Sequence, residues 1–257
     1  MLDALADPVT MPAGWPRRFC CEEDLALIGY DGRDAAKDLA SLHARGPRPT
    51  TQELIDVIRA DGVAGAVVLD VGAGIGAVHL ALLEAGAGHA IDVDASREYL
   101  AAAREEARRR GHAEHVDYRH GDIVELAPDI PRAEIVTLDS VICCYPYLPA
   151  LLAAAVMPGP RLVGLTYPRD TWWMRAFMLA YNVTHSLARS PARYFAHRHR
   201  TVRRLLAEAG YAEIHDGGSP AWRVAVYRAA KASKPAEQRY GHDTRSDEGP
   251  IGLVDET

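Results

Sequence analysis

Short apolar segments alternate with amphipathic segments along the middle of the chain. The apolar segments are rich in Val, Ile and Leu, which is typical of buried strands, and the segments between them repeat apolar side chains at helical spacing. The predicted strands are residues 67–71, 89–93, 116–119, 135–139 and 161–166. The predicted helices between them are residues 77–85, 96–110 and 148–156. Strands that alternate with helices form a parallel sheet covered on both faces, so the pattern predicts an α/β fold.

The last part of this region follows a different pattern. A helix predicted over residues 201–209 leads into two strands, 212–215 and 223–227, which are joined only by the turn-forming segment 216–220. So short a connection permits only antiparallel pairing. We therefore predict a mostly parallel sheet with a C-terminal antiparallel hairpin and helices on both faces.

Two helices are predicted before the first strand. Apolar side chains at helical spacing predict one helix over residues 31–43, which is stopped by the segment 46–49 because it is rich in Gly and Pro. The second helix is predicted to start with Thr50 as its N-cap. Glu53, three residues later, would complete a capping box.

These patterns divide the chain into three parts. Residues 1–49 are a predicted N-terminal helical arm, and residues 50–230 are the main domain. Within the domain, residues 170–200 are too long for an ordinary loop between a strand and a helix and are predicted to form an insertion. Residues 231–257 contain few apolar side chains, so we expect this tail to be disordered.

Composition narrows the class of protein. The chain has 257 residues, of which 48% are hydrophobic and 25% charged, as is typical of globular proteins. A net charge of −6 disfavours a nucleic-acid partner. The sequence contains no apolar segment as long as a membrane span, and its first residues include acids where a secretory signal has bases. We therefore expect a cytoplasmic protein, without a membrane span, that acts on small molecules.

Candidate metal ligands are few in the sequence. The cysteines form two adjacent pairs, Cys20-Cys21 and Cys143-Cys144, a spacing that favours buried apolar residues in a reducing compartment. His197 and His199 alternate with arginines in a way that could suggest a metal. Because no carboxylate or cysteine lies at ligand spacing beside them, a solvated or substrate-facing basic segment is favoured. We expect no metal site.

The most informative segment is a predicted strand that runs directly into a glycine-rich turn. Gly72, Gly74 and Gly76 permit a sharp turn and the close approach of a ligand to the backbone. This spacing alone also fits the dinucleotide-binding proteins. Asp70 precedes the first glycine by two residues, where its carboxylate suits a cationic amino-acid group better than a pyrophosphate. The ligand predicted here is therefore not a diphosphate.

Acidic residues also follow the next two predicted strands. Asp94 ends the second strand, where its carboxylate can accept hydrogen bonds from both hydroxyl groups of a ribose. Asp92 is a competing candidate, and we expect side-chain alternation to turn only one of the two acids toward the ligand. Asp122 and Ile123 follow the third strand, where the acid can bind the exocyclic amine of adenine while the apolar side chain covers the ring.

Over residues 50–228, the chain resembles the class I S-adenosylmethionine-dependent methyltransferases, specifically the group that acts on small molecules. The resemblance rests on segments 70–76, 92–96, 121–123 and 137–140, together with the terminal hairpin. It implies a Rossmann-like fold and S-adenosyl-L-methionine as the cofactor.

The resemblance also implies a role for each of these segments. The glycine turn and Asp70 would hold the methionine moiety, and Asp94 the ribose. Asp122 and Ile123 would bind the adenine, and Asp139 with Ser140 would form the floor near the sulfonium.

The insertion combines aromatic and basic side chains. Trp172, Trp173 and Phe177 lie on a predicted apolar helix, and Arg169 or Arg193 would attract an anionic acceptor. An apolar helix must bury most of its circumference, so we expect it to close over the carboxyl ends of the strands as a substrate lid. A dimer interface and a membrane-surface contact are the alternatives, because an interface uses the same residue types. Both a monomer and a homodimer are compatible with this sequence.

One further sequence motif is typical of dehydrogenases. Tyr227 and Lys231 match the Tyr-x-x-x-Lys pair of short-chain dehydrogenases. That pair lies on a helix in mid-chain, whereas Tyr227 is predicted to close a strand at the edge of the domain and Lys231 begins the tail. An NAD(P)-dependent oxidoreductase is therefore the least favoured reading.

The expected reaction is an in-line displacement that moves the sulfonium methyl group to a small, partly apolar acceptor, with oxygen favoured as the accepting atom. Positioning supplies much of the catalysis, so a dedicated base is optional. Tyr145 and His185 are the candidate bases for a hydroxyl acceptor. The fold with an aromatic insertion is also similar to porphyrin carboxyl methyltransferases. A module that binds S-adenosylmethionine without catalysing transfer is the alternative.

Overall fold

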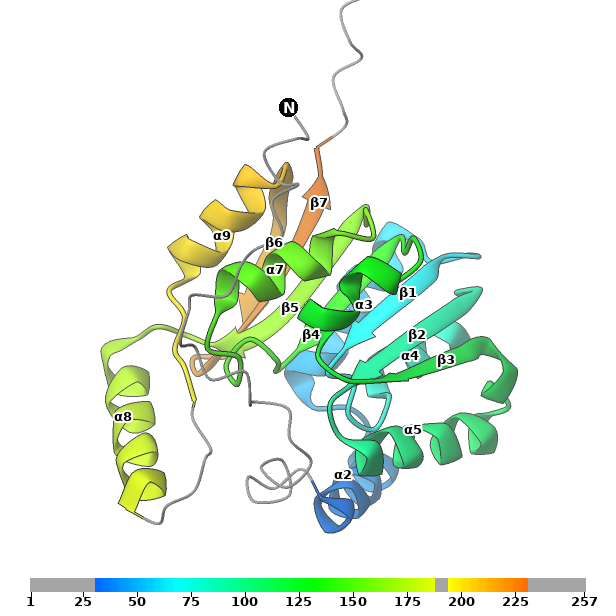
Figure 1. Cartoon of the computed structure of the whole chain (residues 1–257), viewed down its shortest axis with the longest axis horizontal. Coiled ribbons are helices and arrows are strands. Elements are labelled where there is room, and N and C mark those ends of the chain that lie inside the picture. The colour runs from blue at the N-terminus through cyan, green and yellow to red at the C-terminus, as the bar shows by residue number, and fades with distance from the viewer. Residues whose placement is uncertain (1–30, 188–193, 231–257) are drawn as a thin grey trace, which may run out of the picture.

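The computed structural model describes residues 31–187 and 194–230, which form a seven-stranded sheet flanked by helices (Figure 1). The strand order is β3-β2-β1-β4-β5-β7-β6. Strands β1 to β5 pair in parallel, and β7 pairs antiparallel with both β5 and β6. The strands are β1 (Val67–Val71), β2 (His89–Asp94), β3 (Val116–His120), β4 (Ile135–Asp139), β5 (Leu162–Pro168), β6 (Tyr211–Gly218) and β7 (Trp222–Ala229). The mostly parallel sheet with its C-terminal hairpin confirms the predicted fold class.

Helices cover both faces of this sheet. Helices α6, α7 and α9 pack on one face, and α3, α4 and α5 pack on the other. The helices are α2 (Gly32–Arg45), α3 (Pro49–Asp61), α4 (Ala77–Glu84), α5 (Arg97–Arg110), α6 (Ile123–Leu126), α7 (Leu148–Val156), α8 (Trp172–Leu187) and α9 (His199–Glu208), with the short 3-10 helices η2 (Ala113–His115) and η3 (Ala127–Asp129). Burial on both faces explains why the central strands are continuous apolar runs rather than alternating ones. The carboxyl ends of the parallel strands share one edge, and the predicted ligand residues follow those ends.

Helix α3 begins differently from the prediction. It starts at Pro49 with Arg48 as its N-cap, and no side chain caps it. Proline suits the first helical position because its fixed φ is already helical and its missing N–H would be unpaired there. The Glu53 side chain accepts hydrogen bonds from His215 Nε2 at 2.9 Å and from the Gly218 N–H at 3.0 Å. The capping-box prediction was wrong because the C-terminal hairpin binds the glutamate that this local motif requires.

The C-terminal hairpin also corrects the position given to Tyr227. Strand β7 lies between β5 and β6, so β6, not β7, forms this edge of the sheet. The Tyr227 side chain is fully buried, and its hydroxyl donates to Glu213 Oε1 at 3.1 Å. Lys231 lies outside the described residues, as does the rest of the predicted tail.

Helix α8 departs most from expectation. In Figure 1 it extends along one side of the molecule, away from the sheet. Within this helix only Met174 and Met178 are buried. Trp172 is 82% exposed, Phe177 62% and Leu187 81%. The expectation that this helix buries most of its circumference was therefore wrong. Its apolar side chains are distributed around the helix, and only those of the two methionines are buried. In the described part of the chain, no helix combines the length and the apolar character that crossing a membrane requires.

Candidate active site

The glycine turn follows β1 at the edge where the parallel strands end. Gly72, Gly74 and Gly76 have φ values of 60°, 58° and 79°, in the left-handed region that side chains disfavour. A Cβ added to Gly72 would lie 2.7 Å from Cγ2 of Val141, so packing against the segment after β4 also requires glycine there. The turn therefore has the left-handed backbone that its glycines predict, and the close approach of a ligand stays a prediction.

Asp70 is almost completely buried, with 1% of its surface exposed. Its Oδ1 accepts a hydrogen bond from Thr137 Oγ1 at 2.6 Å. Its Oδ2 accepts from the His79 N–H at 3.3 Å and lies 3.0 Å from His79 Nδ1. These hydrogen bonds connect β1 to β4 and to the first turn of α4. Asp70 therefore stabilises the two elements between which the glycine turn lies. Its direct contact with a methionine moiety stays a prediction. Thr137 begins a segment on which the resemblance rests, but no motif in the sequence indicated its contact with Asp70 or the contribution of His79.

Asp94 ends β2 and lies beside the glycine turn. Its Oδ2 accepts from the Gly74 N–H at 2.9 Å, and its Oδ1 accepts from the Ser96 N–H at 2.8 Å. Burial raises the pKa of Asp94, and the hydrogen bonds from Ser96 and Gly74 oppose that rise. The two oxygens of a carboxylate can accept about four hydrogen bonds, so these contacts do not exhaust the capacity of Asp94.

Asp92 lies deeper in the same strand and has no exposed surface. It pairs in register with Asp70 on β1 and with Tyr118 on β3. Residues two apart in a strand share a face, so alternation does not separate Asp92 from Asp94, contrary to our expectation. Depth in the sheet separates them instead. Among the described residues neither oxygen of Asp92 has a hydrogen-bond donor, and burial raises its pKa well above the ordinary value.

Asp122 follows β3 and caps α6. Its Oδ1 accepts from the Val124 N–H at 2.9 Å, and its Oδ2 accepts from the Tyr145 hydroxyl at 2.8 Å. Ile123 is buried in the core on this face of the sheet. Tyr145, a candidate base in the sequence, is thus bonded to the acid predicted to bind adenine.

Asp139 ends β4 and is bound by neighbouring elements. Thr51 of α3 donates to Oδ2 at 2.6 Å, and Thr166 of β5 donates to Oδ1. The next residue, Ser140, has a φ of 66°, a left-handed conformation that is uncommon outside glycine. Arg48 Nη2 donates to Ser140 Oγ at 3.0 Å and lies 3.4 Å from Asp139 Oδ2. The structure therefore brings a guanidinium to the predicted sulfonium end, and no sequence motif indicated Arg48.

The described part of the N-terminal arm packs beside the glycine turn. Ile75 and Tyr99 form a small apolar cluster with helix α2, and the Tyr99 hydroxyl donates to Asp38 Oδ2 at 2.7 Å. Asp31 is the N-cap of α2, where its side chain accepts two backbone hydrogen bonds. Cys20 and Tyr30, which precede this helix, lie outside the described residues.

The predicted lid residues have different surroundings. Trp173 is 40% exposed, less than its neighbour Trp172. His185 stacks on Tyr181, with ring centroids 4.1 Å apart. Arg169 donates to backbone carbonyls of the β6–β7 hairpin, at 2.7 Å each, and its attraction of an anionic acceptor stays a prediction. Arg193 lies outside the described residues.

The segment that returns from the insertion is bonded to the loop between β4 and α7. The Phe195 N–H donates to the Cys143 carbonyl at 2.7 Å, and His197 Nε2 lies 3.1 Å from the Tyr145 carbonyl. Burial lowers the pKa of His197, which favours its neutral form. The insertion and the Asp122 side of the site are therefore connected through Tyr145.

Known proteins share part of this sequence. Residues 68–156, from β1 to the end of α7, match the family model described as a methyltransferase domain. A ribosomal protein L11 methyltransferase from Xylella fastidiosa is 34% identical over 140 residues, which are 52% of this chain and 44% of that protein. A release factor glutamine methyltransferase from Gloeobacter violaceus is 35% identical over 119 residues, which are 45% of this chain and 40% of that protein. The chain thus spans less than half the length of these curated relatives.

Solved structures share the fold. A magnesium protoporphyrin IX methyltransferase from Synechocystis PCC 6803, with bound SAH, superposes with a TM-score of 0.59 at 18% identity. The superposition covers 70% of this chain and 82% of that chain. An O-methyltransferase family protein from Burkholderia thailandensis superposes with a TM-score of 0.62 at 12% identity. This superposition covers 82% of this chain and 64% of that chain. Residues 68–156 therefore match a methyltransferase domain, and the chain shares the fold of these solved structures.

Proposed function

We propose that this protein is an S-adenosylmethionine-dependent methyltransferase that acts on a small, partly apolar acceptor. One observation carries the proposal: the Gly74 N–H and the carboxylate of Asp94 meet at 2.9 Å where β1 and β2 end. This contact joins the turn expected at the methionine moiety to the acid expected at the ribose. Both groups belong to the part of the chain that matches the methyltransferase domain family.

The donors and acceptors at this edge suit the cofactor. S-adenosyl-L-methionine, when bound, supplies an electrophilic methyl group on its sulfonium. Asp94 would accept hydrogen bonds from the ribose hydroxyl groups, and Asp122 would accept one from the adenine amine. The glycine turn would receive the methionine moiety, and Asp139 with Ser140 would lie near the sulfonium. The left-handed φ of the three turn glycines supports this assignment, because side chains disfavour that backbone.

The insertion supports the proposed acceptor class. Trp172, Trp173 and Phe177 offer exposed apolar surface on the helix that directly follows β5. Such rings suit a partly apolar molecule, and the Arg48 guanidinium near Ser140 suits an anionic group on it. A fold neighbour named as an O-methyltransferase family protein supports oxygen as the accepting atom. The relatives named for protein substrates match roughly the domain half of this chain, so they do not argue for a protein acceptor.

Catalysis in this proposal is mainly positional. Holding the acceptor in line with the methyl group can contribute about 7 to 11 kcal/mol of the barrier. A carboxylate acceptor needs no base, and the bond from Tyr145 to Asp122 makes that hydroxyl a positioning group on the adenine side.

Calorimetry with S-adenosylmethionine, S-adenosylhomocysteine, NAD and NADP tests the cofactor. We expect binding of the first two and none of the dinucleotides. Binding of a dinucleotide without the sulfonium ligands would overturn the proposal.

The acceptor is tested by incubation with methyl-labelled S-adenosylmethionine and a cell extract, separated into small molecules and macromolecules. We expect label in the small-molecule fraction. Cofactor binding without labelling of either fraction would favour the non-catalytic binding module, and label in protein would refute the acceptor class.

A further inference from the structure

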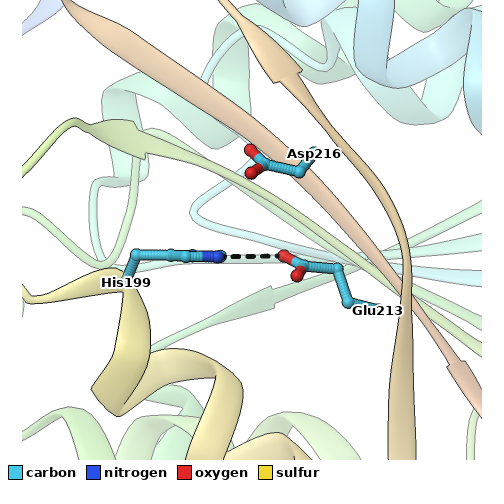
Figure 2. A group of neighbouring side chains, drawn as sticks. All are labelled: His199, Glu213 and Asp216. Carbon is cyan, nitrogen blue, oxygen red and sulfur yellow. Dashed lines mark ion pairs between the residues drawn. The ribbon is translucent and has the colours of Figure 1, made fainter.

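A second group of polar side chains lies between α9 and β6, away from the glycine turn. His199 is the first residue of α9, and Glu213 and Asp216 belong to β6. One ligand atom from each residue lies within 4.8 Å of the other two. Figure 2 shows the imidazole of His199 pointing at the carboxylate of Glu213, with Asp216 on the same side of the strand. The sequence suggested no carboxylate near His199 because these acids follow it at a distance in the chain.

A β-bulge brings the two acids to one face. In a regular strand, residues 213 and 216 would point to opposite faces. Here Glu213 pairs with Tyr227 and His215 with Val226, so the register shifts between Glu213 and His215. His215 consequently points to the other face, where it contacts Glu53 at 2.9 Å. Bulges of this kind re-aim side chains beside functional sites.

Each of the three side chains is oriented by a further residue. The Tyr167 hydroxyl lies 2.8 Å from His199 Nδ1, which leaves Nε2 as the nitrogen that faces Glu213. The Tyr227 hydroxyl donates to Glu213 Oε1, and Arg223 pairs with Asp216. Both tyrosines are buried. Metal-binding histidines and carboxylates are typically held by such outer hydrogen bonds, which orient them toward the ion.

The spacing of His199 and Glu213 suits a small divalent ion. His199 Nε2 and Glu213 Oε1 are 3.3 Å apart. Ligands at about 2.0 to 2.1 Å from a tetrahedral Zn²⁺ are separated by about 3.3 to 3.4 Å. Within the described residues, Arg223 pairs with Asp216, and Glu213 pairs with no arginine or lysine, so a cation would offset the charge of Glu213.

We propose that His199, Glu213 and Asp216 form a binding site for a divalent first-row transition metal such as Zn²⁺. One imidazole and two carboxylates are a mixed nitrogen and oxygen ligand set, which favours Zn²⁺ over Mg²⁺. Water would complete the coordination. The ion would tie the first turn of α9 to β6, and the segment before α9 leads back to Tyr145. This site is independent of cofactor binding.

Isothermal titration of the full chain, after dialysis against a chelator, tests the proposal with Zn²⁺ and Mg²⁺ in separate experiments. We expect one Zn²⁺ per chain and much weaker binding of Mg²⁺. His199→Ala should weaken Zn²⁺ binding by about a hundredfold or more, and Tyr167→Phe, which removes only the outer hydroxyl, by about tenfold.

His215→Ala is the matched control. It removes another histidine of a His–Glu pair, on the other face of the same strand, and should leave the Zn²⁺ affinity within twofold. Asp216→Asn changes the most exposed of the three ligands and should weaken binding by at least tenfold, so the test does not depend on His199→Ala folding. Cysteine binding is identified with Co²⁺, because thiolate ligands add a near-ultraviolet charge-transfer band that imidazole and carboxylate ligands lack.

Three outcomes would overturn the proposal: no Zn²⁺ binding by the parent chain, equal affinity in folded Asp216→Asn and in the parent, or a thiolate band with Co²⁺ at the same stoichiometry. The first would leave His199 and Glu213 as a structural ion pair. Binding of S-adenosylhomocysteine is measured in every variant and should not change. If the parent chain does not bind S-adenosylhomocysteine, that result contradicts the proposed function and leaves the proposed metal site unaffected.

Discussion

Aspartates at the carboxyl edge of the sheet have different tasks because their surroundings differ. Asp70 is buried and bonded to Thr137 and His79, whereas Asp94 accepts two backbone hydrogen bonds at the end of β2. Asp92 is buried without a donor among the described residues. The same side chain is therefore a structural anchor, a candidate ligand contact and a buried acid whose charged form is disfavoured.

Asp94→Ala should weaken the binding of S-adenosylhomocysteine by at least about tenfold, because charge-assisted hydrogen bonds contribute roughly 1.5 to 3 kcal/mol each. Calorimetry measures this change, and circular dichroism checks that the fold is retained. Asp117→Ala, which removes a partly exposed acid of the neighbouring strand β3, is the control and should leave the affinity unchanged. An unchanged dissociation constant in Asp94→Ala would show that the ribose is held elsewhere.

Asp92 makes stability depend on pH. Its pKa is raised in the folded state by burial first, then by the charges of Asp94 and Asp70. The folded state therefore binds the proton more tightly than the unfolded state, and this contribution is greatest below the unfolded pKa and is lost as pH rises through the raised value. Asp92→Asn removes the titration. The variant should have a higher Tm than the parent at pH 8, by a margin that shrinks toward pH 4. A lower Tm at pH 8 would indicate that the carboxylate gains a partner in solution.

Helix α8 is an element whose packing does not match its composition. Its aromatic and aliphatic side chains are largely exposed, and Asn182 joins it to the returning segment through two hydrogen bonds with the Tyr194 backbone, of 2.8 and 2.9 Å. Exposed apolar patches mark binding surfaces. A substrate lid and a dimer interface predict opposite effects of substitutions in this helix on activity and on molecular mass.

Trp173→Ala should leave S-adenosylhomocysteine affinity within about twofold and reduce methyl transfer substantially, because a misplacement of about 1 Å can cost about a hundredfold in rate. The acceptor that gains label in the extract is the substrate for this assay. Leu187→Ala, at the far end of the helix, is the control and should retain activity. Light scattering measures the mass of each variant. A drop in mass, with activity lost only through dissociation, would favour an interface, and normal turnover with normal mass would exclude both roles.

At the scale of the whole molecule, cofactor binding and folding are coupled because the proposed contacts come from β1, β2, β3 and β4. S-adenosylhomocysteine at about 100 times its dissociation constant should stabilise the folded chain by about 2.7 kcal/mol. For a chain of this size, that raises Tm by roughly 5 to 10 °C. NAD at the same concentration is the control and should not shift Tm. A shift with NAD instead would contradict the cofactor assignment.

Truncation after Ala230 should leave Tm and cofactor affinity unchanged, because the composition of residues 231–257 cannot support a core of its own. Thermal unfolding and calorimetry measure both quantities. A loss of several degrees would show that the tail docks on the domain.

The sequence alone determined the elements and their class. The runs 67–71 and 135–139 are apolar enough to be buried on both faces, and their predicted bounds agree with β1 and β4. The short link predicted over residues 216–220 required an antiparallel hairpin. The glycine turn could also be predicted from the sequence, because its left-handed backbone favours glycine at these positions.

Only the tertiary structure decided which distant side chains meet. Glu53 left the predicted capping box because His215 and Gly218 are close to it in space. A register shift of one residue brought Glu213 and Asp216 to His199, although no spacing in the sequence relates them. Periodicity reports which face of an element is apolar. Contacts between polar side chains depend on strand order, register and bulges, which are set by the packing of the whole sheet.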